Sequence, residues 1–483
     1  MTTRSPDEGV AGAVPTGGVD RPLALLVAGA LFMEILDGTV IAPAAPHIAE
    51  DLGVPAVAVN VAITAYVLTL AVLIPVSGWL ADRFGARRVF VTAIVVFTLA
   101  SAGCALATNL DMLTATRVLQ GAGGAMMVPV GRLVVLRATA KADLVTAIAY
   151  LTWPALTAPL VAPALGGFLS TYASWRLIFL INLPLGLVGA LLARRLVPPV
   201  RTADAGPLDW RGFGLTALGV AALSLGIEGA GGQQPRWATV IPEVGGSAVL
   251  LVAAAVYLLH AERPLFDLQV LRVATYRVTA LGGSVFRAVI TAVPFLVPLF
   301  LQLGFGWSAA EAGLIMVALF VGNVGIKPLT TPLMRWFGIK VVMLGAIVAS
   351  AGCLLALARV QPGTAIPVLV VLLACSGMFR SIGFTTFNTV AFVDVRPARM
   401  TSANTLMSTV QELGAGLGVA VGALLVRVGE SVSSRFGPVS SDTPYRYAFV
   451  ALAIILAIPL AEAVLLPRAA GNVATGRAEG GPP

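Results

Sequence analysis

Residues 78–88 read Gly78-Trp79-Leu80-Ala81-Asp82-Arg83-Phe84-Gly85-Ala86-Arg87-Arg88. This short, charged segment lies between two long apolar runs, at about residues 55–80 and 89–107. Each run is long enough to cross a bilayer as a helix, which takes about 20 apolar residues. The segment is therefore predicted to be a tight connection at one membrane face. Its three arginines indicate that this face is cytoplasmic.

Two glycines and one carboxylate give this connection its expected geometry. Gly78 lets a neighbouring backbone approach closely, and Gly85 permits a chain reversal that other residues resist. Asp82 is placed at a helix end, where it can cap backbone amides or pair with Arg87 or Arg88.

The composition indicates the broad class of the protein. The chain has 483 residues, of which 58% are hydrophobic and only 11% are charged. A soluble protein could not bury so much apolar surface with so few charges, so we expect a helical membrane protein whose partner is the lipid bilayer. The net charge of +8 comes from basic residues scattered between apolar spans. It is typical of membrane topology and indicates no nucleic-acid partner.

Fourteen apolar stretches are long enough to span the membrane. An even number of spans puts both termini on one side. With the amino terminus inside, most of the 31 Lys and Arg residues fall in cytoplasmic loops, so both termini are predicted to be cytoplasmic. The predicted spans are residues 22–45, 57–80, 89–107, 111–133, 144–168, 177–197, 211–230, 243–260, 276–303, 309–332, 340–359, 366–391, 402–427 and 447–466.

An internal repeat indicates two related halves with an insertion between them. Arg335-Trp336-Phe337-Gly338-Ile339-Lys340 echoes Asp82-Arg83-Phe84-Gly85-Ala86-Arg87. Two related halves with a site between them are the usual build of secondary transporters. The predicted division is a cytoplasmic tail (1–21), a six-helix half (22–197), a linker with a transmembrane hairpin and a surface segment (198–275), a second six-helix half (276–466) and a cytoplasmic tail (467–483). A plain loop is the alternative for the surface segment, residues 261–275.

Ionisable residues inside the first-half spans are the first functional candidates. Glu34 and Asp37 lie three residues apart in the first span and so share one helix face. Charged groups at such depth are costly and usually functional. Arg117, in the fourth span, is expected at a depth similar to that of Asp37 and could pair with it. The three residues are interpreted either as a structural ion pair or as a proton-handling cluster.

The second half also places charges deep within spans. Lys327, Arg380 and Glu412 are expected at similar depths. They form either one salt-bridged cluster or a set in which at least one residue has a substrate or gating role. The full set of polar and charged candidates for a substrate or gating role is Arg287, Asn323, Lys327, Arg380, Asn388 and Glu412.

The segment at residues 78–88 resembles the signature loop between helices 2 and 3 of the major facilitator superfamily, G-x-L-A-D-R-x-G-x-R-R. The sequence matches at every defined position. The resemblance implies a cytoplasmic latch that holds the two halves of a transporter together when it faces outward. The implied latch residues are Gly78, Asp82, Arg83, Gly85, Arg87 and Arg88.

Further motifs resemble the fourteen-helix drug:proton antiporters of that superfamily. Leu36-Asp37-Gly38-Thr39-Val40 resembles their first-helix motif, and residues 175–186 look very like their sixth-helix signature. Arg117-Val118-Leu119-Gln120-Gly121-Ala122-Gly123 resembles the fourth-helix motif of the superfamily, whose arginine is implicated in proton coupling. In span five, Pro159, Pro163, Gly166 and Gly167 resemble the antiporter motif G-x-x-x-G-P-x-x-G-G, with Ala158 and Ala162 in place of its first two glycines. Close helix packing through small residues survives that change.

Together these features predict an all-α polytopic membrane protein that transports by alternating access. We expect a proton-coupled exporter of amphipathic small molecules such as drugs or lipids. The alternatives are a proton-coupled exporter of a specific anionic or zwitterionic amphiphile and an uptake symporter of a metabolite. The chain is expected to be a monomer in a bacterial-type plasma (inner) membrane. It is expected to use the proton gradient, with no cofactor and no metal.

An enzyme is not expected. An integral-membrane enzyme would need a convergent catalytic site, and the only histidines are His47 and His260. The sequence also lacks a Walker-type loop that would let ATP drive transport.

The predicted topology can be tested with reporter fusions. A reporter fused after Pro483 should behave as cytoplasmic, because the arginine bias places both ends inside. A reporter fused near Gln233, in the inserted hairpin, should behave as external. Alkaline phosphatase and a fluorescent protein, each fused at both sites, would give the two signals, and exchanged signals would contradict the fourteen-span prediction.

Overall fold

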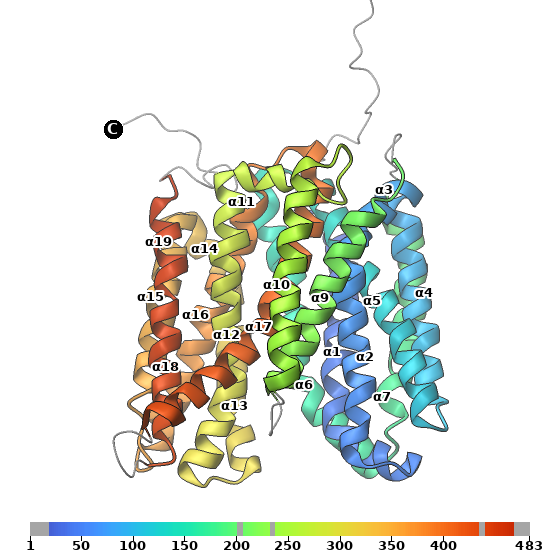
Figure 1. The fold of residues 1–483 in the computed structure, drawn as a ribbon. Coiled ribbons are helices and arrows are strands. Elements are labelled where there is room, and N and C mark those ends of the chain that lie inside the picture. The colour runs from blue at the N-terminus through green and yellow to red at the C-terminus, as the bar shows by residue number, and fades with distance from the viewer. Residues whose placement is uncertain (1–18, 200–205, 232–236, 434–439, 468–483) are drawn as a thin grey trace, which may run out of the picture.

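The computed structural model describes residues 19–199, 206–231, 237–433 and 440–467. Within these ranges the regular structure is entirely helical, and long helices run side by side from one end of the molecule to the other (Figure 1). The predicted all-α class is confirmed. The predicted tails, residues 1–21 and 467–483, lie almost wholly outside the described residues.

The helices follow one another in the predicted order. Residues 21–196 form α1 (Arg21–Leu52), α2 (Asn60–Leu73), α3 (Ser77–Phe84), α4 (Ala86–Ala105), α5 (Leu110–Ala138), α6 (Leu144–Tyr172), α7 (Leu177–Leu180) and α8 (Asn182–Leu196). The inserted hairpin is α9 (Trp210–Gly231) and α10 (Trp237–His260). The remaining helices are α11 (Ala274–Val278), α12 (Ser284–Leu299), α13 (Ala309–Gly325), α14 (Lys327–Phe337), α15 (Ile339–Leu357), α16 (Ile366–Val393), α17 (Met400–Ser433), α18 (Thr443–Ile455) and α19 (Ala457–Leu465).

By the strictest count, the described structure has fewer membrane spans than the predicted fourteen. Among the described residues, 12 helical stretches are long and apolar enough to cross a bilayer. The bent pair α13 and α14, whose axes differ by 47°, makes a thirteenth. The one remaining predicted span, residues 144–168, lies in α6, of which Leu144–Pro159 is a shorter apolar stretch. The count of fourteen therefore stays a prediction.

Both ends of the described chain lie on the same face of the bundle, at the top of Figure 1. We call this side, where α1 begins and α19 ends, the terminal face. The turn between α3 and α4 and the turn between α14 and α15 also lie there. The segment predicted either as a surface element or as a loop, residues 261–275, is a loop that contains one short 3-10 helix, Leu268–Arg272, before α11 begins.

The internal repeat has a structural counterpart in two turns. Gly85 joins α3 to α4 at φ 89° and ψ 133°. Gly338 joins α14 to α15 at φ 85° and ψ 151°. A side chain is strained at such positive φ angles, which explains why both turns use glycine. The two halves therefore make the same reversal with the same backbone conformation.

A basic residue in each turn binds the end of the last helix of its half. Arg87 Nε donates to the carbonyl of Val197, just after α8. Lys340 Nζ donates to the carbonyls of Val464 and Leu466, at the end of α19. Cations suit this position because the last carbonyls of a helix lack partners and carry partial negative charge. The sequence repeat has Arg335 at the position of Asp82, yet the basic residue five positions later makes the same kind of contact in both halves.

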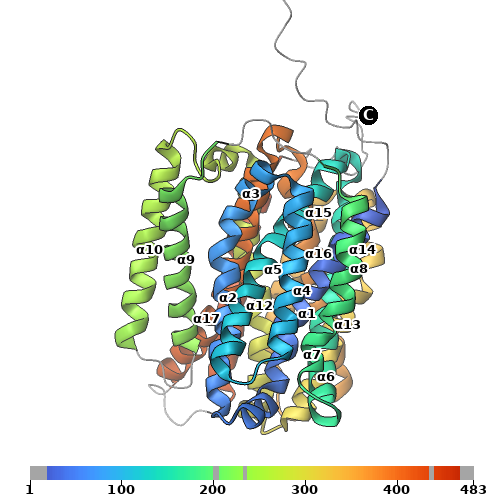
Figure 2. The ribbon, with the colours of Figure 1, turned by 90° about the vertical axis from the view of Figure 1, so that its right-hand side faces the viewer.

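The long helices pack mainly in two groups. In the first, α1 lies along α6 and α5 lies between α4 and α2. In the second, α12 lies along α17, and α16 lies between α13 and α15. The hairpin packs through α9 against α2 of the first group and α17 of the second, at one side of the bundle (Figure 2). The predicted division into two halves and a linker, with its boundaries, stays a prediction.

Helices α13 and α16 approach one another through glycines. A Cβ atom added at Gly377 would lie 1.9 Å from the carbonyl oxygen of Leu319. One added at Gly322 would lie 2.0 Å from the carbonyl oxygen of Ala374. Small residues let membrane helices come into backbone contact, which drives packing where no hydrophobic effect operates.

We expect Gly377→Ala to lower stability by about 1–3 kcal/mol, because the added methyl group meets fixed backbone and forces the helices apart. The measurement is the thermal unfolding midpoint of the detergent-purified protein. Gly345→Ala is the matched control, since a Cβ at Gly345 meets nothing within 4 Å. Equal midpoints for the two variants would contradict the backbone contact.

Candidate functional site

A carboxylate and a guanidinium form a buried ion pair inside the first group of helices. Asp37, on α1, is 1% exposed, and Arg117, on α5, is fully buried. Arg117 Nη1 lies 2.5 Å from Asp37 Oδ2. The structure therefore brings together the two residues whose pairing the sequence suggested. Their roles in proton coupling stay a prediction.

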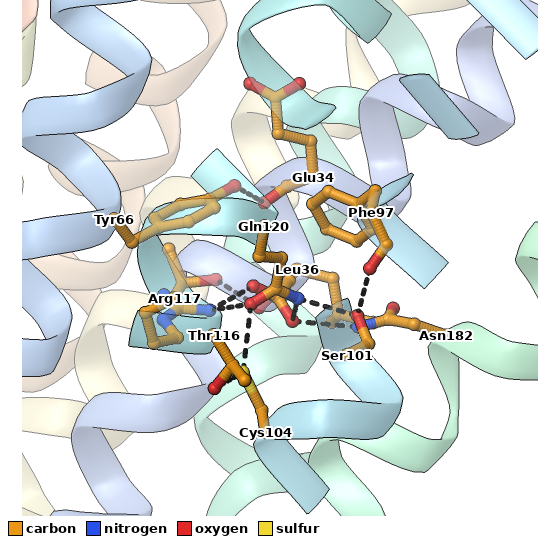
Figure 3. Close-up of polar contacts among 12 residues, drawn as sticks. Glu34, Leu36, Tyr66, Phe97, Ser101, Cys104, Thr116, Arg117, Gln120 and Asn182 are labelled. Carbon is orange, nitrogen blue, oxygen red and sulfur yellow. Dashed lines mark hydrogen bonds and ion pairs between the residues drawn. The ribbon is translucent and has the colours of Figure 1, made fainter. Parts of the chain in front are cut away.

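Two amides complete the hydrogen bonding of this carboxylate. Asp37 Oδ1 accepts from Gln120 Nε2 and from Asn182 Nδ2, each at 2.8 Å. Ser101 Oγ in turn accepts from Gln120 Nε2 at 2.7 Å and donates to the carbonyl of Phe97. Figure 3 shows these side chains converging from separate helices. Three side-chain donors therefore converge on one carboxyl group.

Aromatic rings enclose the guanidinium of Arg117. Its central carbon lies 4.0 Å from the ring centroid of Tyr66 and 5.8 Å from that of Phe179. Its Nε and Nη2 atoms are buried without a hydrogen-bond partner. The arginine is thus held by Asp37, by Gln120 and by ring faces. Protonating Asp37 would leave it with much of its charge unbalanced.

Glu34 belongs to a different neighbourhood. It lies three residues before Asp37 on α1, yet Figure 3 shows its side chain directed away from the buried network. Its Oε2 atom is buried and has no hydrogen-bond partner. The charged groups that affect it are Glu412, Arg132 and Asp37. Among the described contacts, the Glu34 side chain makes no hydrogen bond to the Asp37 network, and only its backbone carbonyl accepts from Tyr66, at 3.4 Å.

Glu34 is one member of a connected set of polar and charged residues from both halves. We call this set the central cluster: Glu34, Arg132, Arg287, Arg380, Asn388, Gln411 and Glu412. Arg132 Nη1 donates to Gln411 Oε1 at 3.1 Å, which links α5 to α17. Arg287 Nε donates to the carbonyl of Gln411 at 2.8 Å, and its guanidinium lies 5.1 Å from the ring of Phe384. The cluster combines charges of both signs with an aromatic face.

Arg132 and Gln411 were not among the sequence candidates. The fourth span was predicted to end at residue 133, which put Arg132 at the membrane surface. The helix instead continues to Ala138, which places Arg132 inside the bundle. The signal was present in the sequence as Arg137, which marks the true last turn of α5.

Of the two alternatives for Lys327, Arg380 and Glu412, the salt-bridged cluster has no ion pair at Lys327 among the described residues. The Lys327 Nζ atom donates to the hydroxyls of Thr152 and Thr385, at 3.1 and 2.6 Å. Arg380 has a buried Nη1 without a partner and is affected by the charge of Arg287. Asn323 is buried with its side-chain amide unsatisfied.

The signature segment touches the second half on the terminal face. Asp82 Oδ1 lies 3.1 Å from Arg137 Nη2, and Thr401 Oγ1, on α17, donates to the same oxygen at 3.2 Å. Arg137 also donates to Thr401. Gly78 lies against α17, because a Cβ there would be 2.2 Å from Thr405 Oγ1. The terminal face is therefore closed between the halves at this point.

The other latch candidates have different surroundings. Arg87 binds the end of α8, Gly85 makes the turn, and the side chains of Arg83 and Arg88 are exposed. The partners Arg137 and Thr401 were missed by the sequence analysis, which considered only charges within the segment itself.

The small-residue motif of α6 lies along α1. A Cβ at Gly166 would lie 2.4 Å from the carbonyl oxygen of Val40, so this glycine allows direct backbone contact. Gly167 faces open space, and Pro159 is half-buried. The side chain of Pro163 lies outside the described residues. The motif therefore has a packing function at Gly166.

On the face opposite the terminal face, an ion pair and a hydrogen bond connect two segments of the first half. Arg176 Nη1 lies 2.6 Å from Asp51 Oδ2, and Trp175 Nε1 donates to the same oxygen at 3.2 Å. These two hydrogen bonds lower the pKa of Asp51. The contact ties the end of α1 to the motif at residues 175–186.

Comparison with known proteins identifies close relatives. The family model described as Major Facilitator Superfamily matches residues 27–419 and 280–481. The chain is 37% identical, over 438 residues, to MdtD of Escherichia coli O139:H28, a protein named for multidrug resistance, and the match covers 90% of this chain and 92% of that one. MdtD of Escherichia coli K12 is 38% identical with the same coverage.

Solved structures share the fold at low sequence identity. The human organic anion transporter MFSD10 (TETRAN) superposes with a TM-score of 0.66 at 13% identity, covering 92% of this chain and 99% of that one. The proton:xylose symporter XylE superposes with a TM-score of 0.60 at 13% identity, covering 93% and 96%.

The latch geometry leads to a prediction for Asp82→Asn. Removing the charge weakens a contact between side chains that are about a quarter exposed, so we expect a cost of about 1 kcal/mol. That shifts the closed-to-open ratio of the terminal face about fivefold towards the open form. The measurement is thiol labelling of Ser402→Cys, a residue that lines a cavity of about 310 Å³ beside the latch. Arg88→Gln, an exposed charge change, is the control. Equal labelling rates in the two variants would mean that the segment is only a turn.

Proposed function

The chain belongs to the Major Facilitator Superfamily, and we propose that it is a proton-coupled exporter of amphipathic small molecules in which Asp37 carries the exchanged proton. It is an integral membrane transport protein and not an enzyme. The observation that carries the proposal is the buried Asp37–Arg117 pair with its two amide donors.

The pair provides two electrostatic states. With Asp37 ionised, the pair is neutral, and all three donors are used. With Asp37 protonated, Arg117 keeps a positive charge in an apolar surrounding, where an unpaired charge costs about 3–5 kcal/mol. That cost favours a conformation in which Arg117 reaches water or another acceptor. Proton binding is thus coupled to rearrangement of the first half.

The central cluster is the proposed substrate site. It lies between the halves, because Arg132 of α5 binds Gln411 of α17. The ring of Phe384 and the flanking charges suit a molecule with an apolar body and a polar group. The MdtD relatives are named for multidrug resistance, which supports drug-type substrates and outward transport.

One observation favours a second candidate within this function. The central cluster contains three arginines, Arg132, Arg287 and Arg380, against two carboxylates, Glu34 and Glu412. This excess of positive charge favours an anionic or zwitterionic amphiphile over a simple cation. Uptake symport of a metabolite has no comparable observation in its favour.

The proposal also includes the membrane, the orientation and the oligomeric state of the protein. An exporter of this type would lie in the bacterial inner membrane, with the terminal face towards the cytoplasm. The latch and the exposed arginines on that face agree with this orientation. A monomer is sufficient, since the site is formed by two halves of one chain.

The test is Asp37→Asn in inverted membrane vesicles energised to pump protons inward. Wild-type vesicles should accumulate an exported probe such as ethidium, and the variant should lose accumulation at least about tenfold, because the titratable proton is gone. Exchange of probe without a gradient should persist. Asp111→Asn, the same change at an exposed residue of α5, is the matched control.

The double variant Asp37→Asn/Arg117→Gln keeps the network neutral and serves as a second test if the single variant does not fold. Full gradient-driven accumulation by either variant would place proton coupling elsewhere in the chain.

A further inference from the structure

Lys327 joins the two halves at a point where the chain bends. It is the first residue of α14, directly after the 47° bend from α13. Its side chain is buried, with the residue 5% exposed. Nζ contacts Thr152 of α6, which belongs to the first half, and Thr385 of α16, which belongs to the second. A single amine therefore bridges the interface.

No counter-ion accompanies this amine in the part of the chain that the structure describes. The helices that pack most closely against α14 are α6, α13, α15 and α16. Within the described residues, the titratable groups on these helices and on α14 itself are Tyr150, Tyr172, Glu311, Arg335, Lys340, Cys353, Cys375 and Arg380. Among these only Glu311 is a carboxylate. It closes a capping box with Ser308 at the far end of α13, about 24 Å along the helix axis from Lys327.

The hydroxyl oxygens of Thr152 and Thr385 each offer Lys327 one hydrogen-bond acceptor. Thr152 Oγ1 donates its own proton to the carbonyl of Ile148 at 2.9 Å. Thr385 Oγ1 donates to the carbonyl of Ser381 at 2.9 Å. Both oxygens must therefore accept from Lys327. A neutral amine has two N–H groups, which match these two acceptors, whereas an ammonium group has a third N–H that would be buried without a partner.

Burial without a counter-ion also opposes the charged form. A lysine is a strongly hydrated point charge, and a charged group inside a membrane-spanning bundle normally has a partner of opposite sign. The number of N–H donors and the lack of a counter-ion among the described residues both favour the neutral amine in this conformation.

We propose that Lys327 is a second proton-responsive group of this transporter, which as a neutral amine holds α6 against α14 and α16 and which on protonation leaves these hydroxyls for water. The step is a simple proton transfer from solvent to Nζ. Lys327 lies about 15 Å from the terminal-face end of α14, so its bridge and the Asp82 latch close the same side of the molecule. The proposal depends on the proposed function only in requiring that the halves move apart on that side.

The sign of the pH effect follows from the proton count. The closed conformation binds one proton fewer than the open one at Lys327, so raising the pH favours closure and lowering it favours opening. Asp37 is a separate group in a different helix interface, and the charges in its network do not contact Lys327 in the described structure.

The experiment measures the distance between two spin labels on the terminal face. Labels are attached at Lys141→Cys and Phe337→Cys, an exposed site before α6 and one at the end of α14, in the full chain with Cys104, Cys353 and Cys375 replaced by serine. Distances are recorded in nanodiscs without substrate from about pH 5 to pH 9, a range that includes the values at which buried lysines titrate. Wild type should change from the short to the long distance as the pH falls.

Three variants separate the outcomes. Lys327→Gln keeps two N–H donors but cannot be protonated, so it should lose most of the pH-driven change and stay at the short distance. Lys327→Arg is always charged and should show the long distance at every pH. Thr385→Val keeps the amine but removes one acceptor, so the midpoint should move to higher pH by about half a unit or more.

A wild-type pH response in Lys327→Gln would overturn the proposal, as would a response abolished by Asp37→Asn and unaffected by Lys327→Gln. The readout needs no transport. If the vesicles fail to accumulate probe while Lys327→Gln still removes the distance change, the proposed function fails and this inference stands.

Discussion

Asp37 and Arg117 neutralise one another inside an apolar group of helices, where an isolated charge would be strongly unfavourable. The cost of separating them determines what surrounds them. Gln120 and Asn182 supply the remaining donors to the carboxylate, and the rings of Tyr66 and Phe179 exclude water from the arginine. Helices α1, α5 and α8 must therefore keep their relative positions for the pair to remain satisfied. Protonation of Asp37 would remove the attraction to Arg117 that favours this arrangement.

The polar contacts lie in three different places in the bundle. The Asp37 network lies within one half, the central cluster lies between the halves, and the Asp82 and Lys327 contacts lie between the halves towards the terminal face. A charge change inside one half can thus alter contacts at the interface only through movement of whole helices. Backbone contacts such as those at Gly166 and Gly377 make this movement rigid rather than local.

Local patterns in the sequence predicted much of the fold and part of the site. The lengths of the apolar stretches predicted most of the spans. Gly85 and its counterpart Gly338 indicated two turns that the structure contains. Depth along a helix was enough to pair Asp37 with Arg117. It was not enough for Lys327, because the bend after Gly325 turns its side chain to Thr152 and Thr385. Arg132 was missed because α5 extends beyond its apolar core, and Arg137 and Thr401 because contacts between distant helices leave no local pattern.

The inserted hairpin has a mechanical consequence that follows from its neighbours. Its helix α9 packs on α2 in one half and on α17 in the other. If the halves rotate relative to each other, α9 cannot keep both contacts unchanged. It must slide along at least one of them in each transport cycle. Gly219 and Gly226 lie instead against α10, because a Cβ there would meet Leu251 and Val244, so these glycines join the two helices of the hairpin closely. The closely packed hairpin is therefore positioned to shift as one unit across the seam between the halves.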